Sequence, residues 1–225
     1  MRFIPLWINK MNEKEDTHEQ MEQIYSKIHP TNIPWNIAAP PELLVKAVET
    51  GKIKSCQAVD LGCGMGNYSV WLAQQGFEVT GFDFSEHAIK QANELAESKG
   101  TYCRFIAANL LGDLKPYHDN FDFAFEWEVL HHIFPENRSC YMQNVSNILR
   151  LGAIYLSVCF SEKDSDFGGK GKYRKTPLGT TLYFSSEKEL RELFDSHFKI
   201  MDLTSLEICG KYGPHMANVA WLENK

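Results

Sequence analysis

Two carboxylates and a run of glycines are the residues of this chain whose types and spacing are most able to do chemistry. Asp60 is followed by three alternating glycines, Gly62, Gly64 and Gly66, and Asp83 comes 21 residues after Gly62. Glycine is required where the backbone takes a positive φ or lets a ligand approach the main chain closely. A carboxylate about 20 residues further on, at the end of the second strand of a βαβ unit, accepts hydrogen bonds from a ribose. The pattern therefore predicts a nucleotide site.

The elements that must position these residues are visible on both sides of the glycines. Residues 58–61 form a short strand-like run, and residues 68–73 carry apolar side chains at a helical period. Residues 77–83 form a second β-rich run that ends in the second acid. The order strand, tight turn, helix, strand is that of a βαβ unit, so Asp83 is expected at the tip of the second strand.

The glycine spacing separates two kinds of nucleotide. A dinucleotide fingerprint has the spacing Gly-x-Gly-x-x-Gly and directs a helix N-terminus at a pyrophosphate. Here the third glycine comes one residue early, and Asn67 stands where the fingerprint places it. Asp60, two residues before the first glycine, suits a cationic group better than a phosphate. A nicotinamide dehydrogenase is kept as an alternative interpretation.

The pattern Asp-x-Gly-x-Gly-x-Gly followed by Asp83 resembles the nucleotide-binding motif of class I S-adenosylmethionine-dependent methyltransferases. The ligand of that family has a ribose and an ammonium group but no phosphate. The resemblance implies S-adenosylmethionine as cofactor and S-adenosylhomocysteine as product. It implies that Asp83 binds the ribose hydroxyls and that Asp60 lies toward the ammonium end. Contacts to the cofactor from Gly62, Gly64 and Phe84 are also expected.

Two further cofactor positions follow from the same resemblance. Residues 102–108 are predicted to form the third strand, with Asn109 and Leu110 at its tip. Many members of the family carry an acid or amide there that binds the exocyclic amine of adenine. Asn109 can accept such a hydrogen bond through its carbonyl oxygen. Leu110 is expected to pack on the adenine ring.

The fourth predicted strand ends in side chains suited to a site. Glu126, Trp127 and Glu128 lie at its carboxyl end, where ligands bind in open α/β sheets. Glu126 is expected to contact the cofactor. His131 follows on the turn and is the candidate catalytic residue, as a base near the reacting centre; an imidazole bonded to the backbone is the alternative. The adjacent histidine pair has no third ligand at a recognisable spacing, so no metal site is expected.

The N-terminal residues 1–51 are predicted to form a helical cap over the cofactor. Helical patterns over residues 12–28 and 41–50 flank a stiff, proline-rich segment that contains Trp35. Trp35 either contacts the ligand or plugs the edge of the core. The segment Pro34-Trp35-Asn36 resembles the Pro-Trp-Asp segment of the thiol and thiopurine methyltransferases, with an amide in place of their usual acid.

Strand and helix patterns alternate five times and end in a hairpin, which predicts an α/β, Rossmann-like doubly wound sheet. The family resemblance implies seven strands in the order 3-2-1-4-5-7-6, with strand 7 antiparallel. Residues 1–225 are expected to form a single methyltransferase domain. A helix over residues 135–150 is expected to end at Gly152. The glycine-rich, charged residues 161–181 are a candidate lid loop over the acceptor.

Composition narrows the partners and the location. The net charge of −6 argues against a general nucleic-acid-binding surface. Six cysteines without a Cys-x-x-Cys pair indicate free thiols in a reducing cytoplasm. The first residues lack the apolar region of a signal peptide, and no apolar run approaches a membrane span. We therefore expect a cytoplasmic monomer or homodimer without nucleic-acid or membrane partners.

The expected function is methyl transfer to a small-molecule nucleophile. The sulfonium methyl is already electrophilic, so an enzyme mainly has to align the acceptor and exclude water. A thiol is the preferred acceptor, and the lysines of residues 161–181 are expected to favour an anionic one. The alternatives are an S-adenosylmethionine-binding protein without transferase activity and a methyltransferase acting on a protein or nucleic acid.

Overall fold

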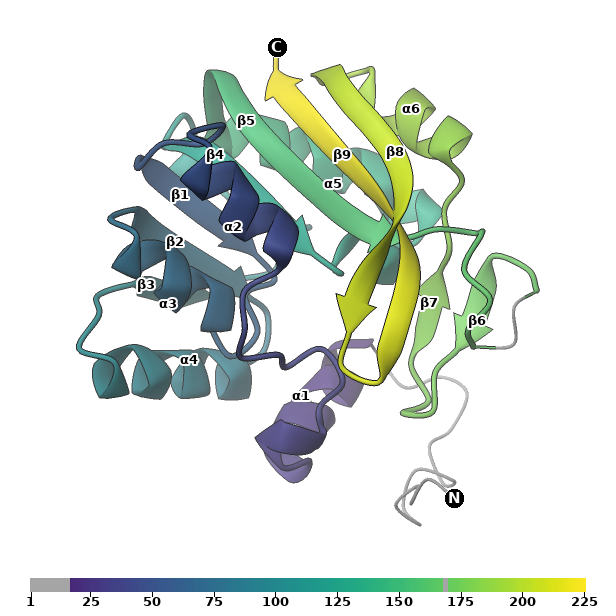
Figure 1. Cartoon of the computed structure of the whole chain (residues 1–225), viewed down its shortest axis with the longest axis horizontal. Helices are drawn as coiled ribbons and strands as arrows, with labels where there is room; N and C mark the ends of the chain where they lie inside the picture. Colours follow the sequence, from purple (N-terminus) through teal and green to yellow (C-terminus); the bar gives the residue numbers. More distant parts are fainter. Residues whose placement is uncertain (1–16, 168–169) are drawn as a thin grey trace.

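The structure of the chain is a computed structural model that describes residues 17–167 and 170–225. Its central sheet has seven strands, β1 (Gln57–Leu61), β2 (Glu78–Asp83), β3 (Arg104–Ala107), β4 (Phe121–Trp127), β5 (Leu149–Phe160), β8 (Phe198–Gly210) and β9 (Gly213–Asn224). They lie in the order β3-β2-β1-β4-β5-β9-β8 (Figure 1). β9 runs antiparallel to both of its neighbours, and the other adjacent pairs are parallel. The predicted α/β class and doubly wound sheet are confirmed.

The strand labels differ in detail from the prediction because the chain contains two additional short strands. β6 (Tyr173–Lys175) and β7 (Thr181–Tyr183) pair with each other in a separate antiparallel sheet. When the strands of the central sheet are numbered by themselves, their order is 3-2-1-4-5-7-6. The segment 161–181, expected as a loop, is therefore partly a β-hairpin.

Helices cover both faces of the sheet, namely α1 (Thr17–Lys27), α2 (Glu42–Glu49), α3 (Asn67–Gln74), α4 (Glu86–Ser98), α5 (Pro135–Ile148) and α6 (Glu187–Phe194). α5 and α6 pack on one face, and α2, α3 and α4 pack on the other (Figure 1). α1 packs against α4. Across the described ranges, every helix falls short of the length and apolarity that a membrane crossing requires.

The local sequence explains where the helices near the site begin. Ser85 precedes α4, and its Oγ accepts a hydrogen bond from the Ala88 N–H over 3.1 Å. Ser186 and Glu189 form a capping box at the start of α6. Both caps satisfy backbone N–H groups that have no partner inside the helix. The two helices therefore begin directly after these serines.

Two helices differ in their bounds from the prediction. α1 corresponds to the helix predicted over residues 12–28, and residues 12–16 of that helix lie outside the described residues. The start of the predicted N-terminal cap also lies outside them. Gly152 was expected to end the helix before it, but α5 ends at Ile148 and β5 begins at once. Gly152 instead lies inside β5 with a φ of 77°, where the register with β4 is irregular. Glycine accepts this left-handed conformation without strain.

The C-terminal strand is fastened to the end of α5 by Asn224. The Asn224 Nδ2 group donates to the carbonyl oxygens of Ser146, Leu149 and Arg150 over 3.0, 3.0 and 3.2 Å. Its Oδ1 accepts from the Ser146 hydroxyl over 2.8 Å. The side chain is only 5% exposed, so water cannot replace it.

We predict that Asn224→Ala lowers the free energy of unfolding by about 1–3 kcal/mol, because it leaves buried carbonyl groups without donors. Lys199→Ala is the control, since its side chain is 66% exposed and pairs with Glu223 at 3.6 Å. This control should change stability by less than about 0.5 kcal/mol. Urea unfolding followed by circular dichroism measures both variants. Equal midpoints for the two would contradict the anchoring role of Asn224.

Candidate active site

A cavity of about 950 Å³ lies at the carboxyl ends of the parallel strands. Residues directly at or after the ends of β1, β2, β3, β4 and β5 line it: Asp60, Asp83, Asn109, Trp127 and Phe160. Ligands bind at this edge in open α/β sheets, because the loops after the strands converge there. The volume suits a small-molecule site.

The glycine turn forms one wall of this cavity. Gly62 and Cys63 donate their backbone N–H groups to the Phe82 carbonyl oxygen over 2.7 and 2.8 Å, which ties the end of β1 to the end of β2. Gly64 has a φ of 51°, and a Cβ there would lie 3.0 Å from the Tyr25 hydroxyl. Glycine is therefore needed at this position both for its conformation and for the approach of Tyr25.

Asp83 is buried beside this turn and lines the cavity. Its Oδ2 accepts from the Gly64 N–H and its Oδ1 from the Ser85 N–H, both over 2.9 Å. Burial raises the pKa of Asp83 to about 6, although these two hydrogen bonds act in the opposite direction. Each carboxylate oxygen keeps a second lone pair that can accept from a ligand hydroxyl.

Asp60 is the second acid of the cavity and has a free oxygen. Its Oδ2 accepts from the Ser69 hydroxyl over 2.7 Å. Its Oδ1 receives no hydrogen bond from the residues that the structure describes. Burial raises the pKa of Asp60 to about 7, the Ser69 bond opposes this, and the nearby Asp83 raises it further. A buried carboxylate with a free oxygen is suited to a cationic partner.

Glu126 was expected to contact the cofactor, but it does not line the cavity. Its Oε2 accepts from the Val129 and Leu130 N–H groups over 2.7 and 3.2 Å, and its Oε1 accepts from the Ser157 hydroxyl over 2.6 Å. The side chain is fully buried under the turn after β4, whose N–H groups it satisfies. Its neighbour Glu128 has a φ of 68° and lines the cavity instead.

Asn109, Leu110 and Phe84 all line the cavity as predicted by their positions after the strands. The Asn109 Oδ1 accepts from the Leu111 N–H over 2.9 Å, so part of its acceptor capacity is used within the loop. Leu110 is also part of the main core. The Phe84 ring lies 5.0 Å from the His18 ring of α1.

The N-terminal segment closes one side of the cavity. The Trp35 indole N–H donates to the Tyr25 hydroxyl over 2.9 Å, and both rings line the cavity. They pack in one cluster with Met21, Ile33 and Met65. Trp35 is therefore packed at an edge of the core, as one alternative predicted, and it also borders the cavity in which a ligand would bind. Tyr25 was not singled out by sequence, since an inward tyrosine of an amphipathic helix carries no signal of its own.

His131 is buried, lines the cavity and stacks on Phe160, with ring centroids 4.3 Å and planes 14° apart. The Phe160 N–H donates to Nδ1 over 3.4 Å, so the neutral ring carries its proton on Nε2. Burial lowers the pKa of His131 well below its ordinary value, and nearby His132, Arg138 and His215 lower it further. Such a ring can donate a hydrogen bond but is poorly suited to take a proton. The geometry favours the alternative of an imidazole bonded to the backbone.

Beyond His131 the cavity is lined by side chains that come from distant parts of the chain. We call them the aromatic arm, and they are His131, Phe160, Phe167, Leu182 and His215. The ring centroids of Phe160 and His215 lie 4.9 Å apart, and those of Phe167 and His215 lie 5.9 Å apart. Sequence reasoning missed Phe167 and His215, because neither belongs to a motif with a recognisable spacing.

Comparison with known proteins agrees with this geometry. Residues 58–152 match the family model of the methyltransferase domain. The chain is 25% identical over 195 residues to the 2-heptyl-1-hydroxyquinolin-4(1H)-one methyltransferase of Mycobacteroides abscessus, and the match covers 84% of this chain and 81% of that protein. It is 27% identical over 137 residues to thiocyanate methyltransferase 1 of Brassica oleracea, covering 60% of each.

The fold comparison gives the same result. The crystal structure of an S-adenosylmethionine-dependent methyltransferase from Methanosarcina mazei matches with a TM-score of 0.68 and 25% identity, over 81% of this chain and 97% of that one. Several RNA methyltransferases also match, but only over about a quarter of their own length. Together with the glycine turn and the two cavity acids, these matches support a class I S-adenosylmethionine-dependent methyltransferase.

Proposed function

We propose that this S-adenosylmethionine-dependent enzyme methylates a small-molecule nucleophile held in the aromatic arm. One observation carries the proposal: a single cavity joins two buried acids, Asp60 and Asp83, to an arm lined by aromatic and aliphatic side chains. The acids suit the cofactor, and the arm suits a flat, apolar acceptor. The match over most of the length of a hydroxyquinolone methyltransferase supports an acceptor of this size.

The residues of the cavity fit S-adenosylmethionine. The free Oδ1 of Asp60 supplies a negative partner for an ammonium group, and no phosphate-binding pattern competes with it. Asp83 is held by two backbone N–H groups with lone pairs left for the two ribose hydroxyls. Asn109 and Leu110 border the position expected for adenine. When bound, the cofactor supplies an electrophilic methyl group on a sulfonium.

The chain's own residues orient the partners and exclude water. Tyr25 and Trp35, joined by a hydrogen bond, cover the glycine turn from the side of α1. His131 and Phe160 stack on each other and line the same cavity as the acids. A cavity enclosed in this way raises the effective concentration of the two reactants and strengthens charge interactions inside it.

The positions of the lysines in residues 161–181 argue against the predicted anionic acceptor. The lysines of residues 161–181 were expected to attract an anionic acceptor, but none of them lines the cavity. Lys163 pairs with Glu187 at 2.6 Å, and Lys172 pairs with Glu189. The residues of this segment that do line the cavity are neutral or acidic: Asp166, Phe167, Thr176, Pro177, Leu178 and Thr180. An acceptor that arrives neutral therefore fits better.

A thiol and a ring hydroxyl are the two acceptor groups we propose. The thiol is supported by the match to a thiocyanate methyltransferase, and by the low cost of forming a thiolate near neutral pH. The ring hydroxyl is supported by the aromatic arm and by the match to a hydroxyquinolone methyltransferase. The six cysteines are unpaired in the structure, which supports our proposal of a reducing, cytoplasmic location.

We predict that Asp83→Ala weakens S-adenosylmethionine binding by about 1.5–3 kcal/mol, which is roughly 10- to 150-fold. The reason is loss of a buried acceptor for the ribose hydroxyls. Glu78→Ala, at the exposed start of the same strand, is the control and should keep the wild-type affinity. Isothermal titration calorimetry measures both, with circular dichroism to check the fold. An Asp83 variant that binds as tightly as wild type would place the ribose elsewhere.

The affinity for S-adenosylmethionine should rise with pH through the pKa of Asp60, about 7. An ionised Asp60 attracts the ammonium group and a protonated one does not, so binding at lower pH must release a proton. Asp83, with a pKa of about 6, adds to the rise at the lower end. Titrations between about pH 5.5 and about pH 7.5 should show a steeper rise in affinity with pH for wild type than for Asp60→Asn. Parallel slopes would remove Asp60 from the ammonium site.

Turnover is tested with labelled S-adenosylmethionine against a panel of thiols, hydroxyquinolones, amines and carboxylic acids. Total protein and total RNA from a lysate serve as macromolecular acceptors in the same assay. We expect methylation of at least one thiol or ring hydroxyl. Methylation of protein or RNA with none of any small molecule would overturn the acceptor class. Tight cofactor binding without transfer to any acceptor would support a binding protein instead.

A further inference from the structure

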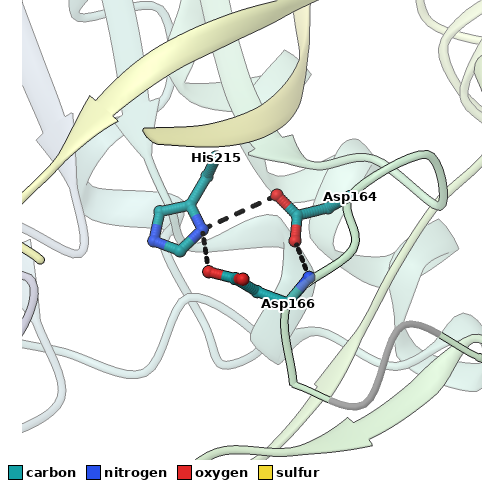
Figure 2. Close-up of side chains that lie close together, drawn as sticks. All are labelled: Asp164, Asp166 and His215. Atoms are coloured by element: carbon teal, nitrogen blue, oxygen red, sulfur yellow. Dashed lines mark hydrogen bonds and ion pairs between the residues drawn. The ribbon is translucent and has the colours of Figure 1, made fainter. Parts of the chain in front are cut away.

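Three side chains outside the cofactor motif, Asp164, Asp166 and His215, lie close together (Figure 2), and two of them, Asp166 and His215, line the cavity. His215 comes from β9, and Asp164 and Asp166 come from the segment after β5. The His215 Nδ1 lies 3.3 Å from the Asp166 Oδ2 and 3.6 Å from the Asp164 Oδ2. Both carboxylates therefore face the same ring nitrogen.

The two acids are held in place by the backbone around them. The Asp164 Oδ1 accepts from the Asp166 N–H over 2.7 Å, and its Oδ2 accepts from the Met216 N–H over 2.6 Å. Arg174 is buried and donates to the Asp164 and Asp166 carbonyl oxygens over 2.6 and 3.1 Å. The side chain of Asp164 is 4% exposed and that of Asp166 is 54% exposed. The pair thus combines a fixed buried acid with a more accessible one.

The His215 ring is fixed by its neighbours. It lies against Phe160 and Phe167, with ring centroids 4.9 and 5.9 Å away. A Cβ at Gly210 would lie 2.6 Å from the His215 Cδ2, so the hairpin needs glycine there to admit the ring. The side chain is 14% exposed, and the ring lines the cavity. Nδ1 faces the two acids at ion-pair distance and is buried without a hydrogen bond from the described residues, while Nε2 lies on the opposite edge of the ring, 2.9 Å from the position of a Cβ at Gly210.

The neighbouring histidines lack this arrangement. The His131 Nδ1 is taken by the Phe160 N–H, which leaves its proton on Nε2. The Nδ1 atoms of His132 and His215 are both buried without a hydrogen bond in the described chain, but burial lowers the pKa of His132 to about 4. Neither the His131 ring nor the His132 ring has a carboxylate at ion-pair distance in the part of the chain that the structure describes. A carboxylate at Nδ1 selects the tautomer with a free Nε2 lone pair and stabilises the imidazolium that forms.

We propose that His215 is the base that takes the acceptor's proton, and that Asp164 and Asp166 position its ring. The inference rests on the proposed function and deepens it. The Nε2 lone pair forms the new N–H bond, and the electron pair of the broken O–H or S–H bond stays on the acceptor atom. That atom becomes the nucleophile, and the positive charge remains on the imidazolium between the two carboxylates. The acceptor class is therefore a ring hydroxyl or thiol that still carries its proton when it binds.

Other charged groups near His215 do not replace the two acids. His131 lies on the turn after β4 and stacks on Phe160, and the nearby His215 lowers the pKa of His131. Lys211, on the β8–β9 hairpin, donates its Nζ to the Ile33 and Asn36 carbonyl oxygens over 2.9 and 3.1 Å. Arg174 is engaged by backbone carbonyls. The two aspartates are thus the groups in ion-pair contact with the His215 ring.

The test compares His215→Ala and Asp166→Asn with wild type, and with His118→Ala, an exposed histidine that does not line the cavity. The acceptors are 2-heptyl-1-hydroxyquinolin-4(1H)-one and the fastest acceptor of the panel. We expect His215→Ala to lower kcat/KM by about 10²–10⁴-fold at neutral pH. Its remaining activity should rise with pH as the free acceptor ionises by itself. Asp166→Asn should give a smaller loss, and His118→Ala none.

Two readouts do not depend on turnover. Calorimetry should give unchanged S-adenosylmethionine affinity for His215→Ala, because the ring lies on the acceptor side. Ultraviolet difference spectra of the acceptor bound with S-adenosylhomocysteine should show an ionised acceptor on wild type and a neutral one on His215→Ala. A wild-type pH profile or an ionised acceptor in the variant would overturn the base role while leaving the transferase intact.

Two other results would also decide between the proposals. One atom each of Asp164, Asp166 and His215 lie within 4.8 Å of one another, so a metal ion bound between them is the competing explanation. Loss of turnover after chelation, restored by a divalent cation, would make Nδ1 a ligand and overturn the base role. No turnover on any small molecule, with cofactor binding intact, would instead overturn the proposed function.

Discussion

The structure of the site depends on one buried carboxylate, Asp83, held between two backbone N–H groups. The Gly64 N–H belongs to the turn after β1, and the Ser85 N–H belongs to the start of α4. A single side chain thus fixes the glycine turn, the end of β2 and the first turn of the next helix relative to one another. A buried acid is costly unless it is hydrogen-bonded, so these elements must keep their arrangement as long as Asp83 is ionised.

The cavity built on this constraint has two parts with different origins. The acids, the glycine turn and Asn109 come from the ends of consecutive strands and are close in sequence. The aromatic arm comes from the turn after β4, the end of β5 and the segment after it, β7, and the start of β9. Site chemistry on a common fold often changes through such loops while the scaffold stays the same. The cofactor part is accordingly the one that resembles the family motif.

The sequence predicted the local parts of the fold well and the long-range parts poorly. The alternating strand and helix patterns and the spacing from Asp60 to Asp83 depend on neighbours in the chain, and the structure has both. Glu126 was predicted to contact the cofactor, but it lies outside the cavity lining and accepts from two backbone N–H groups of the turn after β4. The alternation of strand and helix patterns in the sequence does not predict that turn.

His215 is a site residue that the sequence did not reveal. It lies about 50 residues after the acids that face it, and only the pairing of β9 with β5 brings them together. The β6–β7 hairpin was also missed, because its strands have three residues each and a glycine-rich composition surrounds them. Local composition predicted a loop, whereas buried Arg174, bonded to four carbonyl groups, stabilises an ordered segment.

A crystal structure of the chain with S-adenosylhomocysteine tests the roles of the two cavity acids most directly. We predict the ammonium group within hydrogen-bond distance of the Asp60 Oδ1 and the ribose hydroxyls on the Asp83 carboxylate. The sulfur should then face the aromatic arm. A ligand bound in the reverse orientation, or one that leaves both acids without contact, would contradict these roles.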